Sequence, residues 1–227
     1  MTSAGPGRPR KQQPVRPGAT ARDEILDAAS ELFTSQGFAN TSTRAIADAV
    51  GIRQSSLYHH FGTKDDILAE LLNGTVAGGL AFAVAVHAAP PPSGPGAAAA
   101  RLHAVALYDG SQLCSARWNL GVLYHLPEAR APRFQRFMDD RLQLRQLYRE
   151  LGQTVEEFAP AAPLPRAASL GDLLFRLVES LINLRADGLA DADSATQTAD
   201  AGIVLAGIAA GLDEIRAMSA ALIREFG

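Results

Sequence analysis

Gly51 lies between two short stretches of apolar periodicity in the segment 41–61 and constrains how that segment folds. A glycine just past the last periodic residue usually ends a helix, because it adopts the left-handed conformation without a steric penalty. Ser42 or Thr43 can cap the start of the preceding helix through a hydroxyl group. The apolar residues at helical spacing in that helix are Ile46, Ala47 and Val50. We therefore expect two short helices joined by a tight turn at residues 51–53.

The second helix, expected over about residues 54–61, has an apolar side and a polar side. Leu57 and Phe61 are four residues apart and are expected to face the core together with Ile52. Glutamine pairs with adenine, serine with either base edge, and tyrosine and histidine reach phosphates or thymine methyl groups. This polar side therefore suits a DNA groove, although a merely solvated helix face is the alternative for each residue. The outward residues are Gln54, Ser55, Ser56, Tyr58 and His59.

Further motifs extend the pattern over about residues 19–72. They are Gly37-Phe38, Thr41-Ser42-Thr43-Arg44-Ala45-Ile46-Ala47, Gly51-Ile52, Leu57-Tyr58-His59-His60-Phe61 and Lys64-Asp65-Asp66-Ile67-Leu68. Together they resemble the amino-terminal domain of tetracycline-repressor (TetR) family regulators. The resemblance implies an all-α fold, with an N-terminal three-helix helix-turn-helix domain and a larger C-terminal domain for ligand binding and dimerisation. It also implies double-stranded operator DNA as a partner. The DNA contacts are expected from Ser42, Thr43, Arg44, Arg53, Gln54, Ser55, Ser56, Tyr58, His59 and Lys64.

Arg53 departs from the family pattern, which often has serine before the recognition helix. Arginine cannot accept from the free N–H groups and has the wrong charge for that end of the helix, so we expect it to contact a phosphate or a guanine edge. Lys64 also lies at the positive end of a helix, which Thr63 and Asp66 begin as an approximate capping box. Lysine fits that position if it faces a phosphate.

Three regions are expected along the chain: a disordered basic tail at 1–18, the DNA-binding domain at 19–79 with its motif at 42–61, and a C-terminal domain at 80–227. A first helix is expected at 21–35, and a fourth from Thr63 to about residue 87. The linker 89–96 contains four prolines and two glycines, which exclude a continuous helix. Later helices are expected at about 97–109, 111–125, 132–158, 169–187 and 195–225, and no strand alternation competes with them.

The basic tail holds Arg8, Arg10, Lys11 and Arg16 and no acidic residue. Two roles remain open for it. The run 7–11 resembles a minor-groove hook, and a basic tail can also add affinity by counterion release without reading sequence. The net charge of the whole chain is −3. Residues 1–66 hold eight basic against seven acidic residues, so positive charge is concentrated toward the expected DNA end.

The composition, 47% hydrophobic and 20% charged, is ordinary for a soluble protein. No apolar run reaches the roughly 18 uncharged residues that span a bilayer, so we expect a cytoplasmic protein without a membrane partner. The single cysteine, Cys114, cannot form an intramolecular disulfide; it is a core residue or an oxidant sensor. No metal spacing or catalytic motif is evident, so we expect no cofactor and no enzymatic activity.

The C-terminal helices suggest a dimer interface and a small-molecule site. Small residues next to apolar ones make the last two helices apolar over a wide arc, which favours a homodimer, although burial within one subunit is the alternative. The expected interface residues are Leu173, Leu177, Val178, Leu181, Ile203, Gly207 and Ala210. A site for an unidentified effector is expected from Phe82, Cys114, Arg117, Trp118, Asn119, Tyr124, His125, Phe137, Met138 and Phe175. Ordinary core packing is the alternative role for each of these residues.

These observations favour a homodimeric repressor that a small molecule releases from its operator. One alternative is a DNA-bound protein whose C-terminal helices recruit a protein partner and enclose no ligand cavity. The absence of a dense acidic lining favours apolar or weakly acidic ligands over multivalent cations.

Overall fold

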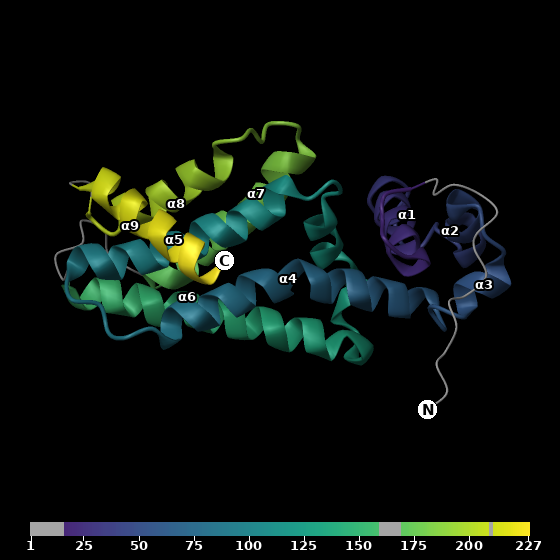
Figure 1. Cartoon of the computed structure of the whole chain (residues 1–227), viewed down its shortest axis with the longest axis horizontal. Helices are drawn as coiled ribbons and strands as arrows, with labels where there is room; N and C mark the ends of the chain where they lie inside the picture. The colour runs from purple at the N-terminus through teal and green to yellow at the C-terminus, as the bar shows by residue number, and fades with distance from the viewer. Residues whose placement is uncertain (1–15, 159–168, 209–210) are drawn as a thin grey trace, which may run out of the picture. The chain divides into compact units, whose positions relative to one another are not determined.

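The computed structural model describes residues 16–158, 169–208 and 211–227, and every regular element in these ranges is a helix. The chain divides into two compact units between Ile67 and Leu68 (Figure 1). This division falls inside one long helix, earlier than the expected boundary after residue 79. The expected basic tail lies mostly outside the described residues.

The N-terminal unit contains three helices and the start of a fourth. They are α1 (Ala21–Ser35), α2 (Thr43–Val50), α3 (Gln54–Tyr58) and α4 (Lys64–Ala88). Phe33 and Phe38 pack edge to face with their ring centroids 5.0 Å apart, and Ile46, Leu57 and Phe61 are buried in the same unit. The expected bounds of α1 and α2 are confirmed. The helix α3 ends at Tyr58, earlier than the expected residue 61.

Side-chain caps determine where these helices begin and end. The Ser42 hydroxyl accepts a hydrogen bond from the Ala45 amide at 3.0 Å, and Gly51 ends α2 in the left-handed conformation with φ 74°. At the start of α4 the Thr63 amide donates to the Asp66 carboxylate at 2.8 Å, and the Asp66 amide donates to the Thr63 hydroxyl at 3.1 Å. Both expected caps are confirmed, including the reciprocal box with aspartate in place of glutamate.

The C-terminal unit is built from the rest of α4 and from later helices joined by three short 3₁₀ turns. The helices are α5 (Pro95–Ser115), α6 (Gln135–Phe158), α7 (Leu170–Ala186), α8 (Ser194–Leu205) and α9 (Leu212–Phe226). The 3₁₀ turns are η1 (Leu120–His125), η2 (Pro127–Arg130) and η3 (Pro132–Phe134). The helix α5 packs against α6, α7, α8 and α9.

Two expected helix boundaries in this unit are wrong. The expected break near residue 110 is absent, because the single helix α5 continues through Gly110. The glycine serves helix packing instead, since a Cβ added there would lie 3.0 Å from the Leu181 side chain. The expected helix 111–125 is therefore divided between the end of α5 and a 3₁₀ turn. The expected helix 195–225 is divided into α8 and α9, since Gly207 and Gly211 both have left-handed φ values of 83° and 81°.

Glycines also allow helices of this unit to approach closely. A Cβ on Gly171 of α7 would lie 2.0 Å from the Tyr148 carbonyl oxygen of α6, and one on Gly152 would lie 2.5 Å from the Gly171 nitrogen. A Cβ on Gly202 of α8 would lie 2.5 Å from the Leu174 side chain. Gly202 therefore serves the packing of α8 against α7 within one subunit.

The helix α4 is long and apolar enough to cross a membrane by length and composition alone, contrary to the sequence-based expectation. Its residues Val76, Phe82, Ala83 and Val86 are buried in the C-terminal unit. A core helix has this composition as well, so the burial accounts for it.

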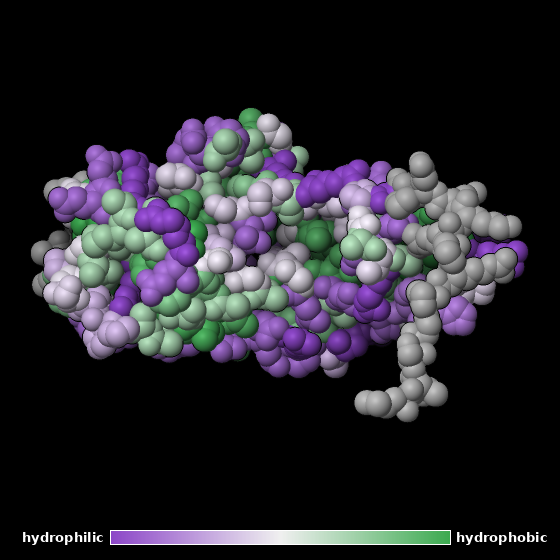
Figure 2. Space-filling view, in the orientation of Figure 1, coloured by the Kyte–Doolittle hydropathy of each residue, from purple (hydrophilic) through white to green (hydrophobic). Residues whose placement is uncertain are grey.

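The C-terminal unit nevertheless leaves large apolar side chains on its surface. On the face shown in Figure 2, apolar residues are interspersed with hydrophilic ones over this unit. The exposed large apolar residues of the helices α6 to α9 are Leu142, Phe158, Leu173, Val204, Leu205 and Met218.

A buried acid lies in the core of the C-terminal unit. The Tyr148 hydroxyl donates a hydrogen bond to the Asp109 carboxylate at 3.0 Å, and both side chains are buried. Burial raises the pKa of Asp109 to about 6, although the hydrogen bond from Tyr148 opposes the shift. Because the folded-state pKa exceeds the unfolded one, Asp109 stabilises the fold fully below about pH 4, and this contribution is lost as the pH rises through about 6.

Asp109→Asn should therefore make the protein more stable near neutral pH, because asparagine can accept from Tyr148 without a buried charge. The gain in free energy of unfolding should reach up to about 3 kcal/mol at pH 7.5 and vanish near pH 4. Urea unfolding of the wild type and the variant at both pH values measures it. The control is Asp187→Asn at an exposed position. An equal effect in the control, or a gain independent of pH, would contradict a raised pKa for Asp109.

Candidate nucleic-acid interface and ligand pocket

The helix α3 separates its apolar and polar residues as the sequence predicts. Leu57 is fully buried, whereas Gln54, Ser55 and Tyr58 are exposed, with Tyr58 48% accessible. His59 follows the helix and is exposed too, and Ser56 is half-buried. A polar surface suitable for base edges and phosphates therefore lies on this helix and its C-terminal end.

Three polar side chains on this surface hydrogen-bond to one another. The Gln54 amide nitrogen donates to the Thr43 hydroxyl at 2.9 Å and approaches the Tyr58 hydroxyl at 3.4 Å. The Thr43 and Tyr58 hydroxyls are 3.1 Å apart. The sequence indicates each residue singly, but it does not reveal that the first residue of α2 and the two end residues of α3 share one network. We call Thr43, Gln54 and Tyr58 the interface triad.

The interface triad holds its members in fixed orientations before any contact with DNA. Ordering a flexible side chain at an interface costs about 0.5–1.5 kcal/mol, so a prearranged set binds with a smaller entropic loss. The Gln54 carbonyl oxygen and the Thr43 and Tyr58 hydroxyls keep further hydrogen-bonding capacity, whereas both N–H donors of the Gln54 amide are used within the triad.

The other residues predicted to contact DNA differ in exposure and in whether their side chains already have partners. The Ser42 hydroxyl is committed to the α2 cap, and the exposed Arg44 lies 3.9 Å from Asp48. Arg53 is exposed at the start of α3 and makes no side-chain capping bond, which agrees with its unfavourable cap position. Its guanidinium group is thus presented at the surface beside Gln54.

Lys64 is turned into its own unit. Its ammonium group donates to the backbone carbonyls of Phe38 at 2.7 Å and Thr41 at 2.8 Å, and it lies 4.2 Å from the centroid of the Phe38 ring. These contacts use two of its three donors and brace α4 against the loop before α2, which leaves one donor for the expected phosphate contact.

Two arginines that sequence reasoning did not single out for this purpose also brace the unit. Arg16, expected in a free tail, donates to the Ala49 carbonyl at 3.0 Å and pairs with Asp27 at 2.9 Å. Arg22 donates to the His60 carbonyl at 2.8 Å and lies 4.1 Å from the Phe61 ring centroid. The predicted hook at residues 7–11 lies outside the described residues.

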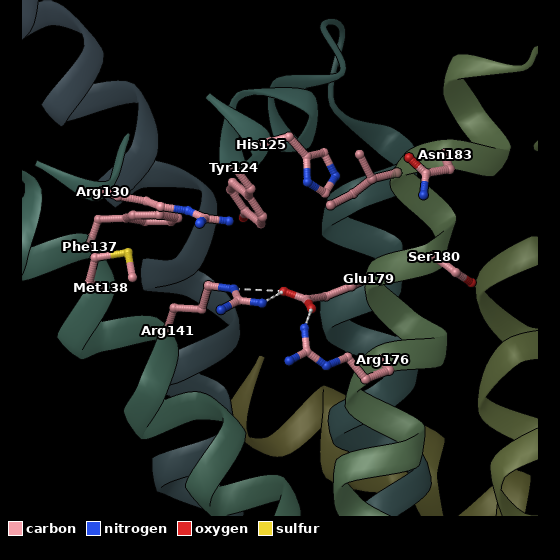
Figure 3. A pocket seen from close by; sticks show the side chains of 11 residues that line it. Tyr124, His125, Arg130, Phe137, Met138, Arg141, Arg176, Glu179, Ser180 and Asn183 are labelled. Carbon is pink, nitrogen blue, oxygen red and sulfur yellow. Dashed lines mark hydrogen bonds and ion pairs between the residues drawn. The ribbon is translucent and has the colours of Figure 1, made fainter. Parts of the chain in front are cut away.

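A pocket of about 600 Å³ lies in the C-terminal unit (Figure 3). Four of the predicted ligand residues line it: Tyr124, His125, Phe137 and Met138. The sequence analysis missed the charged part of the lining, which consists of Arg130, Arg141, Arg176 and Glu179. Ser180, Ile182 and Asn183 of α7 complete it. A volume between about 300 and 1,000 Å³ is typical of small-molecule sites.

The other predicted ligand residues do not line this pocket. Phe82 stacks on Tyr108 with ring centroids 4.3 Å apart, and Phe175 packs against Tyr148. The Asn119 amide donates to the Ile182 carbonyl at 2.9 Å. These three therefore support the pocket wall or the core rather than facing a ligand.

The residues predicted near the end of α5, Cys114, Arg117 and Trp118, do not line the pocket either. The Arg117 guanidinium lies 4.8 Å from the Trp118 ring, so these two side chains cover one another. Burial raises the pKa of the Cys114 thiol, which disfavours the reactive thiolate. The structure thus gives no support to Cys114 as an oxidant sensor.

A serine, a histidine and an aspartate form a chain in the same unit. His103 Nδ1 lies 2.9 Å from the Ser219 hydroxyl, and its Nε2 lies 3.0 Å from the Asp200 carboxylate. Hydrolases use these residue types, but neither His103 nor Ser219 has any exposed surface. No substrate can reach the hydroxyl, so we interpret the chain as a link between α5, α8 and α9.

One comparison with known proteins matches part of the chain, mainly the N-terminal unit, and another matches nearly the whole chain. The family model for bacterial regulatory proteins of the tetR family matches residues 25–71. The crystal structure of AmtR from Mycobacterium smegmatis is 47% identical and has a TM-score of 0.84, with 93% of this chain and 98% of that chain covered. This chain belongs to the TetR family of transcriptional regulators.

Other relatives of this TetR-family protein match over less of their length or at lower identity. The transcriptional repressor KstR2 of Rhodococcus jostii is 49% identical over 53 residues, which cover 23% of this chain and 26% of KstR2. The chain thus matches only about a quarter of this curated relative. The structure of the ketosteroid regulator KstR2 of Mycobacterium tuberculosis is 22% identical with a TM-score of 0.63, covering 84% of this chain and 94% of that one, and shows the same fold.

The residues predicted for a TetR-type dimer interface are partly buried in the subunit itself. Val178, Leu181 and Ile203 are at most 2% exposed, so they belong to the subunit's own core and not to an open surface. Leu173 is 42% exposed, Leu177 is half-buried and Gly207 is exposed. Ala210 lies outside the described residues. The helical periodicity identified apolar positions but not which of them the neighbouring helices cover.

Lys64→Met should loosen the TetR-type domain, because two backbone carbonyls lose a charged donor. The loss should be about 1–3 kcal/mol, which is seen as amide hydrogen exchange at least about tenfold faster in α2 and α3. Arg44→Met, which removes an exposed charge from the same unit, should leave exchange unchanged. If Lys64→Met instead left exchange unchanged and lowered the salt dependence of DNA binding by about one ion, the lysine would be a phosphate contact after all.

Proposed function

We propose that this protein is a homodimeric transcriptional repressor that binds an operator through α3 and leaves it when a small molecule binds in the C-terminal pocket. The observation that carries the proposal is the interface triad of a TetR-type domain, in which the exposed Gln54 and Tyr58 of α3 bond with Thr43 of α2. As a DNA-binding regulator it acts in the cytoplasm, where bacterial operators are accessible.

DNA recognition on this proposal begins with the side chains of α3. The Gln54 amide can pair with the N6 and N7 atoms of adenine in the major groove, with its carbonyl oxygen accepting and its nitrogen donating. Its N–H group then exchanges the Tyr58 hydroxyl, its more distant partner at 3.4 Å, for the base. Arg53 contacts a phosphate or guanine beside it, and the Tyr58 hydroxyl reaches the backbone. A helix as short as α3 makes few base contacts, so useful affinity requires two copies about 34–36 Å apart on the DNA.

Exposed apolar side chains on α7, α8 and α9 support the proposed homodimer. Val204 and Leu205 are 47% and 38% exposed, Met218 is 36% exposed, and Leu173 is 42% exposed. Side chains of this size are costly to leave in water, and a second subunit would cover them. The interface we propose therefore uses these residues in place of the buried Val178, Leu181 and Ile203.

Effector control requires a physical link between the pocket and the DNA-binding unit. The Tyr124 hydroxyl, in the pocket wall, donates to the Thr75 hydroxyl of α4 at 2.8 Å. The same helix begins at Lys64 in the N-terminal unit. A ligand that displaces Tyr124 therefore acts directly on α4. It releases the operator only if it binds the form that lacks DNA more tightly.

Gln54→Ala should weaken binding to the DNA upstream of the protein's own gene about tenfold or more, because a bidentate base contact is lost. Fluorescence anisotropy with the labelled fragment at two salt concentrations measures the affinity. Gln36→Ala removes the same side chain from an exposed position at the end of α1 and should change nothing. Equal affinities for the two variants, or no binding of the wild type at low salt, would refute the proposed interface.

Val204→Glu should convert the dimer to a monomer, because a carboxylate cannot be buried in an apolar interface without a large desolvation penalty. Sedimentation equilibrium should show the wild type at twice the mass of the variant. Leu142→Glu is the matched control, since Leu142 is 62% exposed on α6. A monomeric wild type, or a variant that remains dimeric, would exclude this interface.

A further inference from the structure

Charged residues in the pocket suggest the chemical class of its ligand. Arg130 at the end of η2, Arg141 of α6 and Arg176 of α7 line it, and Glu179 of α7 is the only carboxylate among the lining residues that the structure describes. Figure 3 shows Arg130 and Arg141 directed into the space that Glu179 and Arg176 face from the opposite helix. Three guanidinium groups and one carboxylate thus line this pocket.

Glu179 satisfies only two of these arginines. Arg141 Nε donates to one carboxylate oxygen at 2.7 Å, and Arg176 donates to the other at 3.0 Å. Arg130 is exposed and, among the described residues, has no hydrogen-bond or ion-pair partner. The pocket therefore holds an excess of positive charge and a guanidinium group with free donors, a combination that binds carboxylates and phosphates well.

Apolar side chains form another part of the lining, beside the uncharged polar residues Ser180 and Asn183. Phe137 and Ile182 are each 2% exposed, and the Tyr124 ring lies 5.1 Å from that of Phe137. Met138, whose flexible thioether adapts to varied shapes, lies beside them. A fully hydrophilic anion would leave this surface unused, so the lining suits a ligand with an anionic end and an apolar body.

We propose that the pocket binds a small organic carboxylate with an apolar body, and that Glu179 competes with the ligand for Arg141. This rests on the proposed function in that it names the class of the effector. The ligand carboxylate accepts from Arg130 and replaces Glu179 as an acceptor for Arg141. Because the Arg141–Glu179 pair joins α6 to α7, binding loosens that connection beside Tyr124.

The test is calorimetric titration of the full-length protein at pH 7.5 with octanoate and with its neutral counterpart octanamide. Octanoate should bind about tenfold or more tightly than octanamide, because a charged hydrogen bond is worth about 1.5–3 kcal/mol. Arg130→Gln should weaken octanoate binding about tenfold without changing octanamide binding. Glu179→Gln should strengthen octanoate binding several-fold, since the internal competitor loses its charge. Arg136→Gln, an exposed arginine of α6 outside the pocket, should behave as the wild type.

Three results would overturn the proposal: no octanoate binding at millimolar concentration, equal affinity for octanoate and octanamide, or weaker binding after Glu179→Gln in a variant with wild-type thermal unfolding. Operator binding is measured on the same samples. Intact operator binding with any of these results rejects the ligand class alone. Octanoate binding by a protein that binds no operator rejects the proposed function and leaves the carboxylate site standing.

Discussion

The left-handed turn at Gly51 is the constraint on which the DNA-binding surface depends. It ends α2 at Val50 and redirects the chain so that Leu57 of α3 is buried. Once Leu57 is inside, helical geometry places Gln54 and Tyr58 outside, on one face and four residues apart. The start of α2 then lies close enough for Thr43 to bond with both. The interface triad is thus a consequence of the turn and of one buried leucine, and a β-branched residue at position 51 would disturb it at its origin.

An analogous close approach organises the C-terminal unit. With glycine at 152 and 171, the backbones of α6 and α7 come within a distance that no side chain would allow. Long side chains farther along the two helices then reach across, so that Arg145 and Arg149 bond with Asp172, and Arg141 with Glu179. Nearer the 3₁₀ turns the pocket lies between these two helices. The charges at the pocket therefore belong to a longer series of α6–α7 ion pairs, and Arg130 is the member of the pocket that this series leaves without an anion.

Features that depend on interactions between residues close in sequence could be predicted, whereas features that depend on residues distant in sequence could not. The bounds of α1 and α2 were predictable because local signals determine them: a cap at Ser42 and a left-handed glycine at 51. Gly110 and Gly207 show the limit of local signals. Gly110 lies inside α5, whereas Gly207 follows the end of α8 with a left-handed φ, and only tertiary contacts distinguish the two glycines. The inward turn of Lys64 depends on carbonyls at Phe38 and Thr41, distant in sequence. Tyr124 and Phe137 were likewise predictable as pocket residues from their residue types, but the pairing of Arg141 with Glu179, 38 positions away, was not.

The long helix α4 is the element through which the two proposed activities can be coupled. Its start is fixed by the reciprocal bonds of Thr63 and Asp66 and by the Lys64 brace, so its first turn moves with the N-terminal unit. Thr75 lies about 16 Å farther along, at 1.5 Å per residue, where the Tyr124 hydroxyl bonds to it. A helix transmits a displacement over this distance because its backbone bonds are continuous. If a ligand displaces Tyr124, the hydrogen bond between the Tyr124 and Thr75 hydroxyls would carry that change to α4.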